Sequence, residues 1–158
     1  MNEIKVKLEK VDVKEKEILF RLLQYSLFEE SETDLNEMNS DALFDYDWFD
    51  NYFTDDDRCA FFIKEQQTDK LLGFVMINSF VQFCNSGHSI AEFMVIPKYR
   101  RNKIGKQVAI QIFDMFKGDW EVKPSYKSEK AYYFWKKVIE EYTKNNYEFK
   151  DELFIFSN

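Results

Sequence analysis

Hydrophobic residues recur along this chain at two different spacings, and each spacing predicts one kind of secondary structure. Apolar and charged side chains alternate over residues 4–11, which indicates a half-buried β-strand. Apolar residues then recur every three or four positions, at Ile18, Leu19, Leu22, Leu23 and Leu27. This spacing places them on one face of a helix. Asp12 precedes that helix and is suited to capping its first turn.

The same two spacings continue through the rest of the chain. The other predicted strands are two that are joined by a turn within residues 58–80, one over 88–96, one over 119–126 and one or two over 147–157. Helical spacing predicts two long helices, over residues 104–118 and 128–144, and residues 34–57 predict a short helix with irregular structure. This order of elements predicts an α/β or α+β fold, in which helices cover one sheet.

Composition limits the class of protein. The 158 residues suit a single domain, 1–158, and 45% of them are hydrophobic, enough for one sizeable core. The amino terminus has no signal-peptide core, and no apolar run approaches the roughly 20 residues of a membrane span. Cys59 and Cys84 are too few for a disulfide framework and lie at no metal-ligand spacing. We therefore expect a cytoplasmic protein without a metal or a membrane segment, and the net charge of −7 argues against nucleic-acid binding.

One segment, YRRNKIGKQV over residues 99–108, gathers positive charge in this acidic chain. Between Phe93 and Phe113 there is no Asp or Glu, whereas five Lys or Arg residues lie there. A strand, a basic loop and a helix in this order can bind phosphate, because the first N–H groups of a helix lack partners within it. Gly105 would let an anion approach the backbone closely. A solvated helix end is the alternative that these residues leave open.

Residues 92–114, EFMVIPKYRRNKIGKQVAIQIFD, resemble the central motif of the GNAT superfamily of CoA-dependent N-acetyltransferases. In that family a strand ends in V-x-P-x-[YF]-R, and an [RQ]-x-x-G-x-[GA] loop wraps the CoA pyrophosphate before a helix. Arg100 and Gly105 fill the first and last positions of the loop pattern, while Lys103 stands where the family usually has its middle glycine.

A second segment, SEKAYYFW over residues 128–135, resembles another family motif, N-x-x-A-x-x-[FL]-[YW]. Ala131 and Phe134 match it, and Ser128 replaces the Asn. The resemblance implies a mixed, mostly antiparallel sheet of six to seven strands with a central splay, flanked by about four helices. It also implies an acyltransferase that moves an acetyl group from acetyl-CoA to a primary amine by direct attack in a ternary complex.

The resemblance further implies where acetyl-CoA binds. Its pantetheine arm would enter the gap between the fourth and fifth strands and pair with the strand backbone around Met94 and Val95. Backbone N–H groups of residues 101–106 would hold the pyrophosphate, helped by the side chains of Arg100 and Arg101. The implied cofactor-binding residues are Met94, Val95, Arg100, Arg101, Asn102, Lys103, Ile104, Gly105, Lys106 and Phe134. Core packing is the alternative role for Phe134.

Such a reaction needs a base, because an amine is an ammonium at neutral pH. Glu92 is our candidate, since a period of two places it between Ile90 and Met94 on one strand face. Partial burial there would raise its pKa and make it a better base. The alternative is a strand Glu paired with Lys or Arg. His88, the one histidine, is a second candidate for proton relay.

The departing thiolate must also gain a proton. Many family members use a Tyr four residues after the matched Ala, but Trp135 stands at that position here. Tyr126 and Tyr133 are the candidates for this general acid, and an ordered water is the alternative.

The acceptor side of the site is expected in an acidic region. From Glu29 to Asp57 there are 12 acidic residues and no Lys or Arg, which favours a small-molecule or peptide amine, possibly polycationic. A solvated surface is the alternative, and the sequence is compatible with a monomer or a homodimer. The departures at Lys103 and Ser128 also keep open a degenerate GNAT-fold module that binds acyl-CoA or a protein partner without transferring a group.

Overall fold

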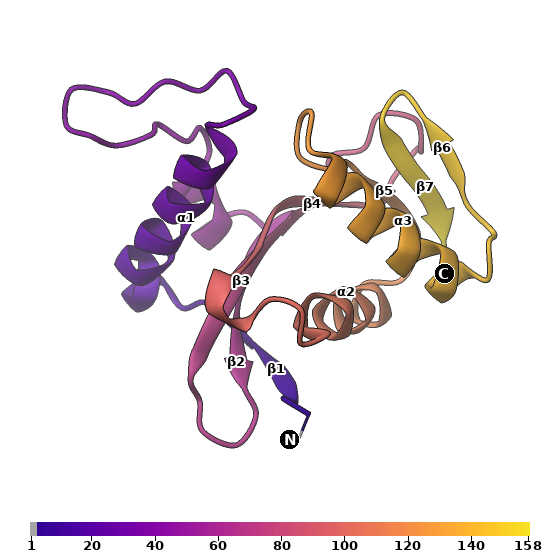
Figure 1. Ribbon diagram of the computed structural model, residues 1–158. Coiled ribbons are helices and arrows are strands. Elements are labelled where there is room, and N and C mark those ends of the chain that lie inside the picture. The colour runs from indigo at the N-terminus through magenta and orange to yellow at the C-terminus, as the bar shows by residue number, and fades with distance from the viewer. Residues whose placement is uncertain (1–2) are drawn as a thin grey trace.

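The computed structural model describes residues 3–158, which build a seven-stranded sheet with helices on both faces (Figure 1). The strands lie side by side in the order β1-β2-β3-β4-β5-β7-β6. They are β1 (Val6–Lys10), β2 (Arg58–Glu65), β3 (Leu71–Asn78), β4 (His88–Val95), β5 (Asp119–Val122), β6 (Glu148–Lys150) and β7 (Leu153–Ser157). All neighbouring strands are antiparallel except β4 and β5. The mixed, mostly antiparallel sheet expected from the sequence is confirmed.

Helices cover the two faces of the sheet unequally, as Figure 1 shows. Helix α1 (Lys16–Glu30) packs on one face, and α2 (Ile104–Met115) and α3 (Glu129–Thr143) pack on the other. Each face therefore has its own core, with Leu23 of α1 in the first and Ile112 of α2 in the second. None of the helices in residues 3–158 combines the length and hydropathy needed to cross a membrane.

Residues 3–158 contain three α-helices rather than about four, because residues 34–57 form no α-helix. Only a 3₁₀ turn, η2 (Asp50–Phe53), and an isolated bridge between Met38 and Phe44 occur there. The side chain of Asn39 accepts hydrogen bonds from the N–H groups of Asp41 and Leu43, at 2.9 and 3.1 Å. Such local bonds compete with helical ones.

Three other local features, a helix cap, a turn and a strand end, occur where the sequence predicted them. Asp12 forms a capping box with Glu15 on a short 3₁₀ turn, η1 (Val13–Glu15), that leads directly into α1. The turn between β2 and β3 contains Asp69 in a left-handed conformation, with φ of 60°. Strand β4 ends just before a third 3₁₀ turn, η3 (Pro97–Tyr99), where proline cannot continue the ladder.

The alternation of side chains along β4 is interrupted by a bulge, which corrects one expectation. Met76 of β3 lies opposite Glu92, but the next residue, Ile77, lies opposite Ile90, so Ala91 is an extra residue in β4. A bulge shifts the alternation by one position. Ile90 therefore packs in the core beneath α2 and α3, and the prediction that it shares a face with Glu92 was wrong.

Strands β4 and β5 separate soon after they meet. They pair only at His88 with Trp120 and at Ser89 with Glu121. From Ile90 onward β4 has no strand partner on that side among residues 3–158. This divergence is the central splay that the resemblance implies.

A buried carboxylate holds the loop beside this divergence. Glu121, on β5, is 1% exposed and accepts hydrogen bonds from the backbone N–H groups of Gln82, Phe83 and Cys84, at 2.8, 3.1 and 3.3 Å. These N–H groups belong to the connection between β3 and β4. Glu121, the last residue of β5 that pairs with β4, thus ties this connection to the point where the two strands separate.

We expect Glu121→Ala to lower the free energy of unfolding by about 2 kcal/mol, because it removes a buried carboxylate that accepts three hydrogen bonds from part-buried N–H groups. Urea unfolding followed by circular dichroism measures the difference. Glu148→Ala, at an exposed position of β6, is the matched control and should change stability by less than about 0.5 kcal/mol. Equal unfolding midpoints for the two variants would contradict this role of Glu121.

Candidate active site

The divergence of β4 and β5 opens a cavity of about 860 Å³. Its walls come from the end of α1, the free edge of β4, the basic loop with the first turn of α2, and one side of α3. Cavities of this size hold cofactor-sized ligands. The structure therefore brings together segments that are far apart in the sequence around one space.

The basic loop turns sharply before α2. Arg101 and Lys103 both adopt left-handed conformations, with φ of 66° and 59°. Lys103 is the residue before the helix, and its side chain does not cap the first turn. The first N–H groups of α2 are thus free to bind an anion, and the helix dipole favours negative charge there.

The left-handed conformation of Lys103 explains why the family pattern has glycine at this position. Glycine adopts positive φ without steric cost, whereas a side chain is disfavoured. Lys103 accepts that cost and adds a positive charge that is exposed beside the cavity. The loop conformation is thus retained with a different residue.

The basic residues of the loop have different roles in the structure. Arg100 donates its Nε–H to the carbonyl of Val95 at 2.8 Å and forms an ion pair with Glu29 at 2.9 Å, so its side chain ties the loop to β4 and α1. Lys106 forms an ion pair with Glu141 of α3. Arg101 and Lys103 line the cavity, and neither forms an ion pair within residues 3–158.

The two segments that resemble family motifs meet at Gly105. A Cβ atom at Gly105 would lie 3.0 Å from the ring of Phe134 and 3.7 Å from that of Phe93. The close packing of α3 on α2 therefore favours glycine at this position, because any side chain would push against the ring of Phe134. Phe134 lines the cavity from α3 together with Trp135, and the two rings pack against each other. Ser128 caps α3 by accepting a hydrogen bond from the N–H of Ala131 at 3.1 Å.

The backbone of β4 offers hydrogen-bonding groups to the cavity at different residues from those expected. The N–H of Ile96, just after β4, donates a hydrogen bond to the carbonyl of Leu72 on β3 at 2.8 Å. Counting back from Ile96, the backbone groups of every second residue therefore point towards β3. The carbonyl of Met94 lies against Gly73 of β3. Backbone groups alternate in direction along a strand, and those of Phe93 and Val95 therefore face the cavity. Met94, which was expected to pair with the ligand, thus directs its carbonyl at β3. Arg100 occupies the carbonyl of Val95, whose N–H faces the cavity.

Glu92 lies on β4 at the α1 side of the cavity and is half-buried. Burial raises the pKa of this carboxyl well above its ordinary value of 4.5, and the negative charge of Glu30 raises it further. Glu30 is the last residue of α1 and lines the same cavity as Glu92. The hydroxyl of Tyr46 acts in the opposite direction and partly offsets this rise in the pKa of Glu92.

Glu30 was missed in the sequence, since nothing near it marks a site. It belongs to a run of acidic residues at the end of a helix, which is typical of a solvated surface. Only the packing of α1 against β4 places it beside Glu92. No local pattern predicts such a contact between distant segments.

Three residues with candidate proton-transfer roles lie outside the cavity lining. Tyr126 is 40% exposed and lies in the turn beyond β5, which ends at Val122 rather than at residue 126. Tyr133 is 62% exposed on the outer side of α3. His88 packs against Phe116 and Trp120, and its Nε2 lies 3.0 Å from the carbonyl of Lys117.

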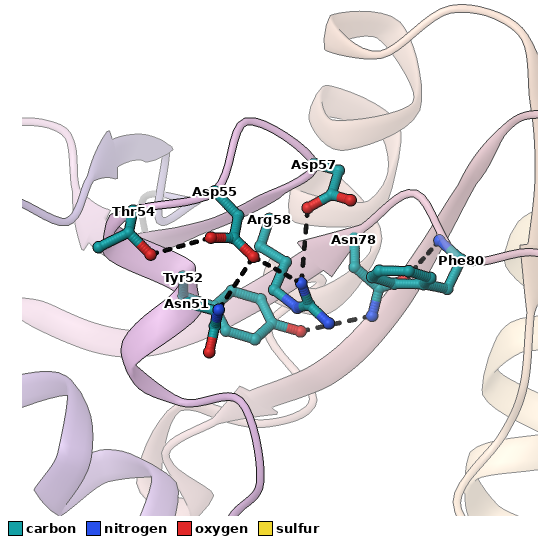
Figure 2. Close-up of polar contacts among 8 residues, drawn as sticks. All are labelled: Asn51, Tyr52, Thr54, Asp55, Asp57, Arg58, Asn78 and Phe80. Carbon is teal, nitrogen blue, oxygen red and sulfur yellow. Dashed lines mark hydrogen bonds and ion pairs between the residues drawn. The ribbon is translucent and has the colours of Figure 1, made fainter.

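The acidic region divides into two environments. Near η2, Arg58 forms ion pairs with Asp55 and Asp57 at 2.9 and 3.5 Å, and Figure 2 shows both carboxylates directed at its guanidinium. That guanidinium lies 5.5 Å from the ring of Trp48 and 4.4 Å from the ring of Phe80. These carboxylates are thus already paired with a cation.

A second group of acidic residues lies at the end of α1 and faces the large cavity. It consists of Glu29, Glu30 and Glu32. Within residues 3–158, no group of three or more His, Cys, Asp or Glu side chains is arranged to hold a metal ion.

Comparisons with known proteins agree with this geometry. The family model described as the acetyltransferase (GNAT) family matches residues 24–139. No curated protein matches the sequence. An acetyltransferase from Thermus thermophilus is similar in structure, with a TM-score of 0.67 and 13% identity over 100% of both chains.

Two further solved structures have the same fold. An aminoglycoside antibiotic 6′-N-acetyltransferase from Acinetobacter baumannii has a TM-score of 0.58 and 10% identity over 85% of this chain and 89% of that chain. A spermidine N-acetyltransferase from Vibrio cholerae, in complex with CoA and spermine, has a TM-score of 0.55 and 8% identity over 95% and 91% of the two chains. At such low identities the likeness shows the fold alone.

The raised pKa of Glu92 predicts how stability depends on pH. Above its ordinary pKa of 4.5 the unfolded chain releases this proton while the folded protein keeps it, so the free energy of unfolding falls as pH rises towards the folded-state value. Glu92→Gln removes this loss. We expect the variant to gain stability over wild type as the pH rises above about 4.5, by about 1.4 kcal/mol for each unit by which the pKa is raised.

Urea unfolding at several pH values measures this difference. Glu17→Gln, at an exposed position in the first turn of α1, is the matched control and should run parallel to wild type. A Glu92→Gln curve that also runs parallel to wild type would show that the carboxyl titrates normally.

Proposed function

This chain belongs to the GNAT acetyltransferase family, and from that premise we propose that it transfers the acetyl group of acetyl-CoA to a primary amine of a small molecule or peptide. The observation that carries the proposal is the cavity, which combines three features along one path. These are the anion-binding start of α2, the free backbone edge of β4 and the half-buried carboxyl of Glu92. They supply a phosphate site, a guide for an extended arm and a base.

The residues at the basic end fit the diphosphate of CoA. The first N–H groups of α2 and the side chains of Arg101 and Lys103 would hold it, because anions bind well at helix starts with added positive charge. Arg100 shapes the loop through Val95 and Glu29. Asn102 does the same by donating to the carbonyls of Tyr99 and Arg100, both at 3.1 Å.

The edge of β4 fits the pantetheine arm. Backbone groups of Phe93 and Val95 face the cavity and would pair with the two amides of the arm. Ile104 is buried beneath the loop and keeps the start of α2 against β4. Phe134 would contact the arm from α3. When bound, acetyl-CoA supplies a thioester whose carbonyl carbon the amine attacks.

Glu92 would then remove a proton from the acceptor. An amine must be neutral to attack, and a carboxyl with a raised pKa is a stronger base than an ordinary one. Tyr126 and Tyr133 lie away from the cavity lining, so we assign neither of them the proton that the thiolate gains. Water supplies it, since a thiolate is a good leaving group and needs little assistance.

The acceptor would enter from the acidic end of the cavity. Glu30 and Glu32, together with Glu29, which is paired with Arg100, give this end a negative field that favours a cationic amine. Similar proteins are described as an aminoglycoside acetyltransferase and a spermidine acetyltransferase. Those acceptors carry several amino groups, which supports a polycationic acceptor here.

The proposal is tested by mixing the protein with acetyl-CoA and measuring thiol release across a library of primary amines. We expect release with cationic amines, and we expect Glu92→Gln to lower kcat about a hundredfold or more while acetyl-CoA affinity stays the same. Binding of acetyl-CoA without thiol release from any amine would instead favour an acyl-CoA-binding module.

Charge reversal tests the phosphate site. We expect Arg101→Glu with Lys103→Glu to weaken acetyl-CoA binding at least about tenfold, because charge-assisted bonds to the diphosphate are lost. Binding of a pantetheine fragment without the diphosphate should change much less. Isothermal titration calorimetry measures both.

The matched control for charge reversal is Lys14→Glu with Lys70→Glu. Both side chains are exposed and lie outside the cavity lining, and the change in net charge is the same. Equal weakening of both ligands by Arg101→Glu with Lys103→Glu would place the diphosphate elsewhere. Equal weakening by the control would show that only overall charge matters.

A further inference from the structure

A second recess, of about 410 Å³, lies next to the large cavity on the α1 side of the sheet. Ala91, the extra residue in the bulge of β4, lines both spaces. The next residue of β4, Glu92, lines the large cavity and is the proposed base. An acceptor whose amine reaches Glu92 can therefore place its other end in the recess.

The recess already contains a cation of its own. The guanidinium of Arg58 lies 4.4 Å from the ring centre of Phe80 and 5.5 Å from that of Trp48. It thus occupies the place that a ligand cation would take in an aromatic cage. Asp55 and Asp57 balance its charge through ion pairs at 2.9 and 3.5 Å, so an anionic group would gain little there. The part of a ligand that suits this recess is consequently uncharged.

Hydrogen-bonding groups of both kinds line the recess. Arg58 uses only its Nη1 in its ion pairs, and its Nε and Nη2 have no partner among residues 3–158. No buried side-chain nitrogen in that part of the chain is unpaired, so these two nitrogens are accessible. The hydroxyl of Tyr52 accepts a hydrogen bond from Asn78 at 3.4 Å and can also donate one (Figure 2). Asp47 adds a carboxylate that accepts.

Two aromatic side chains of the recess remain open to a ligand. Trp48 is 66% exposed and Phe80 is 53% exposed, although each has Arg58 beside it. Trp48 also has a φ of 69°, a conformation that is unfavourable for a bulky side chain. Strained residues of this kind gather at ligand sites. The two rings therefore offer flat apolar surfaces at the edge of a polar recess.

We propose that this recess binds the uncharged part of the acceptor, and that this part is a hydroxylated ring. The inference rests on the proposed function and narrows the acceptor to an amine carried on such a ring. Hydroxyl groups both donate and accept, which matches the mixed lining of Arg58, Tyr52 and Asp47. The C–H face of a saturated ring would lie against Trp48 or Phe80, because the faces of aromatic rings carry negative charge. A linear polyamine offers no such face and would bring positive charge to Arg58.

Binding measured without acetyl-CoA tests the recess separately from the transfer reaction. Trp120 and Trp135 are 0% and 5% exposed, so Trp48 is the exposed tryptophan of the chain. We expect glucosamine to change the tryptophan fluorescence of the wild-type protein, and we expect Trp48→Phe to lose that change. Cyclohexylamine has a ring and an amine but no hydroxyl group, and it should bind at least about tenfold more weakly than glucosamine. Equal affinity for the two amines, or a signal that persists in Trp48→Phe, would overturn the inference.

Removal of one aromatic surface tests where the ring lies. Phe80→Ala should raise the dissociation constant of glucosamine about fivefold or more, because a stacked aromatic contact is lost. Phe28→Ala is the matched control, since Phe28 is 65% exposed on α1 and lies outside the linings of both spaces. It should leave the dissociation constant unchanged. Equal weakening by the two substitutions would place the ring elsewhere.

Kinetics with two amines separate the recess from the proposed function. Phe80→Ala should raise KM for glucosamine by a similar factor, while KM for the linear diamine cadaverine and the affinity for acetyl-CoA stay the same. Binding of glucosamine at Trp48 without thiol release from any amine would support the recess and count against the transferase. Thiol release with cadaverine but no binding of glucosamine would overturn the recess and leave the transferase in place.

Discussion

Strands β4 and β5 are parallel, and this requires the chain to leave one end of β4 and return to the opposite end before β5 begins. Helix α2 makes that crossing, so its first turn must lie at the end of β4. The two strands pair at only two positions and then separate. The helix start, with its unpaired N–H groups, therefore lies where the sheet opens, and the location of the anion site follows from the crossover.

The bulge at Ala91 then determines which side chains of β4 face α1 and which face α2 and α3. With a regular strand, Ile90 and Glu92 would face α1 together, and the core beneath α2 and α3 would lose an apolar residue. The extra residue sends Ile90 into that core and leaves Glu92 facing α1, next to Glu30. A local irregularity in one strand thus serves both packing and the position of the carboxyl.

Features that depend on neighbours in the sequence could be predicted, and those that depend on tertiary contacts could not. The strand periods, the capping by Asp12 and the two motif segments are local, and they were enough to predict the sheet and the basic loop. The meeting of Glu30 and Glu92 in the lining of one cavity and the ion pair of Arg100 with Glu29 involve distant segments. Which backbone groups of β4 face the cavity depends on its pairing with β3, which no motif encodes.

The positive charge of the basic loop has two separate uses within this acidic chain. Arg100 forms an ion pair with Glu29, which holds the loop against α1. Lys106 forms an ion pair with Glu141, which holds the start of α2 against α3. Arg101 and Lys103 are left to face a ligand. The same cavity is also lined by the carboxylates of Glu29, Glu30 and Glu32, and the ion pair of Glu29 with Arg100 joins the acidic group to the basic loop. In the proposed reaction the loop would attract a diphosphate and the carboxylates would attract a cationic amine, which would bring the amine towards the thioester.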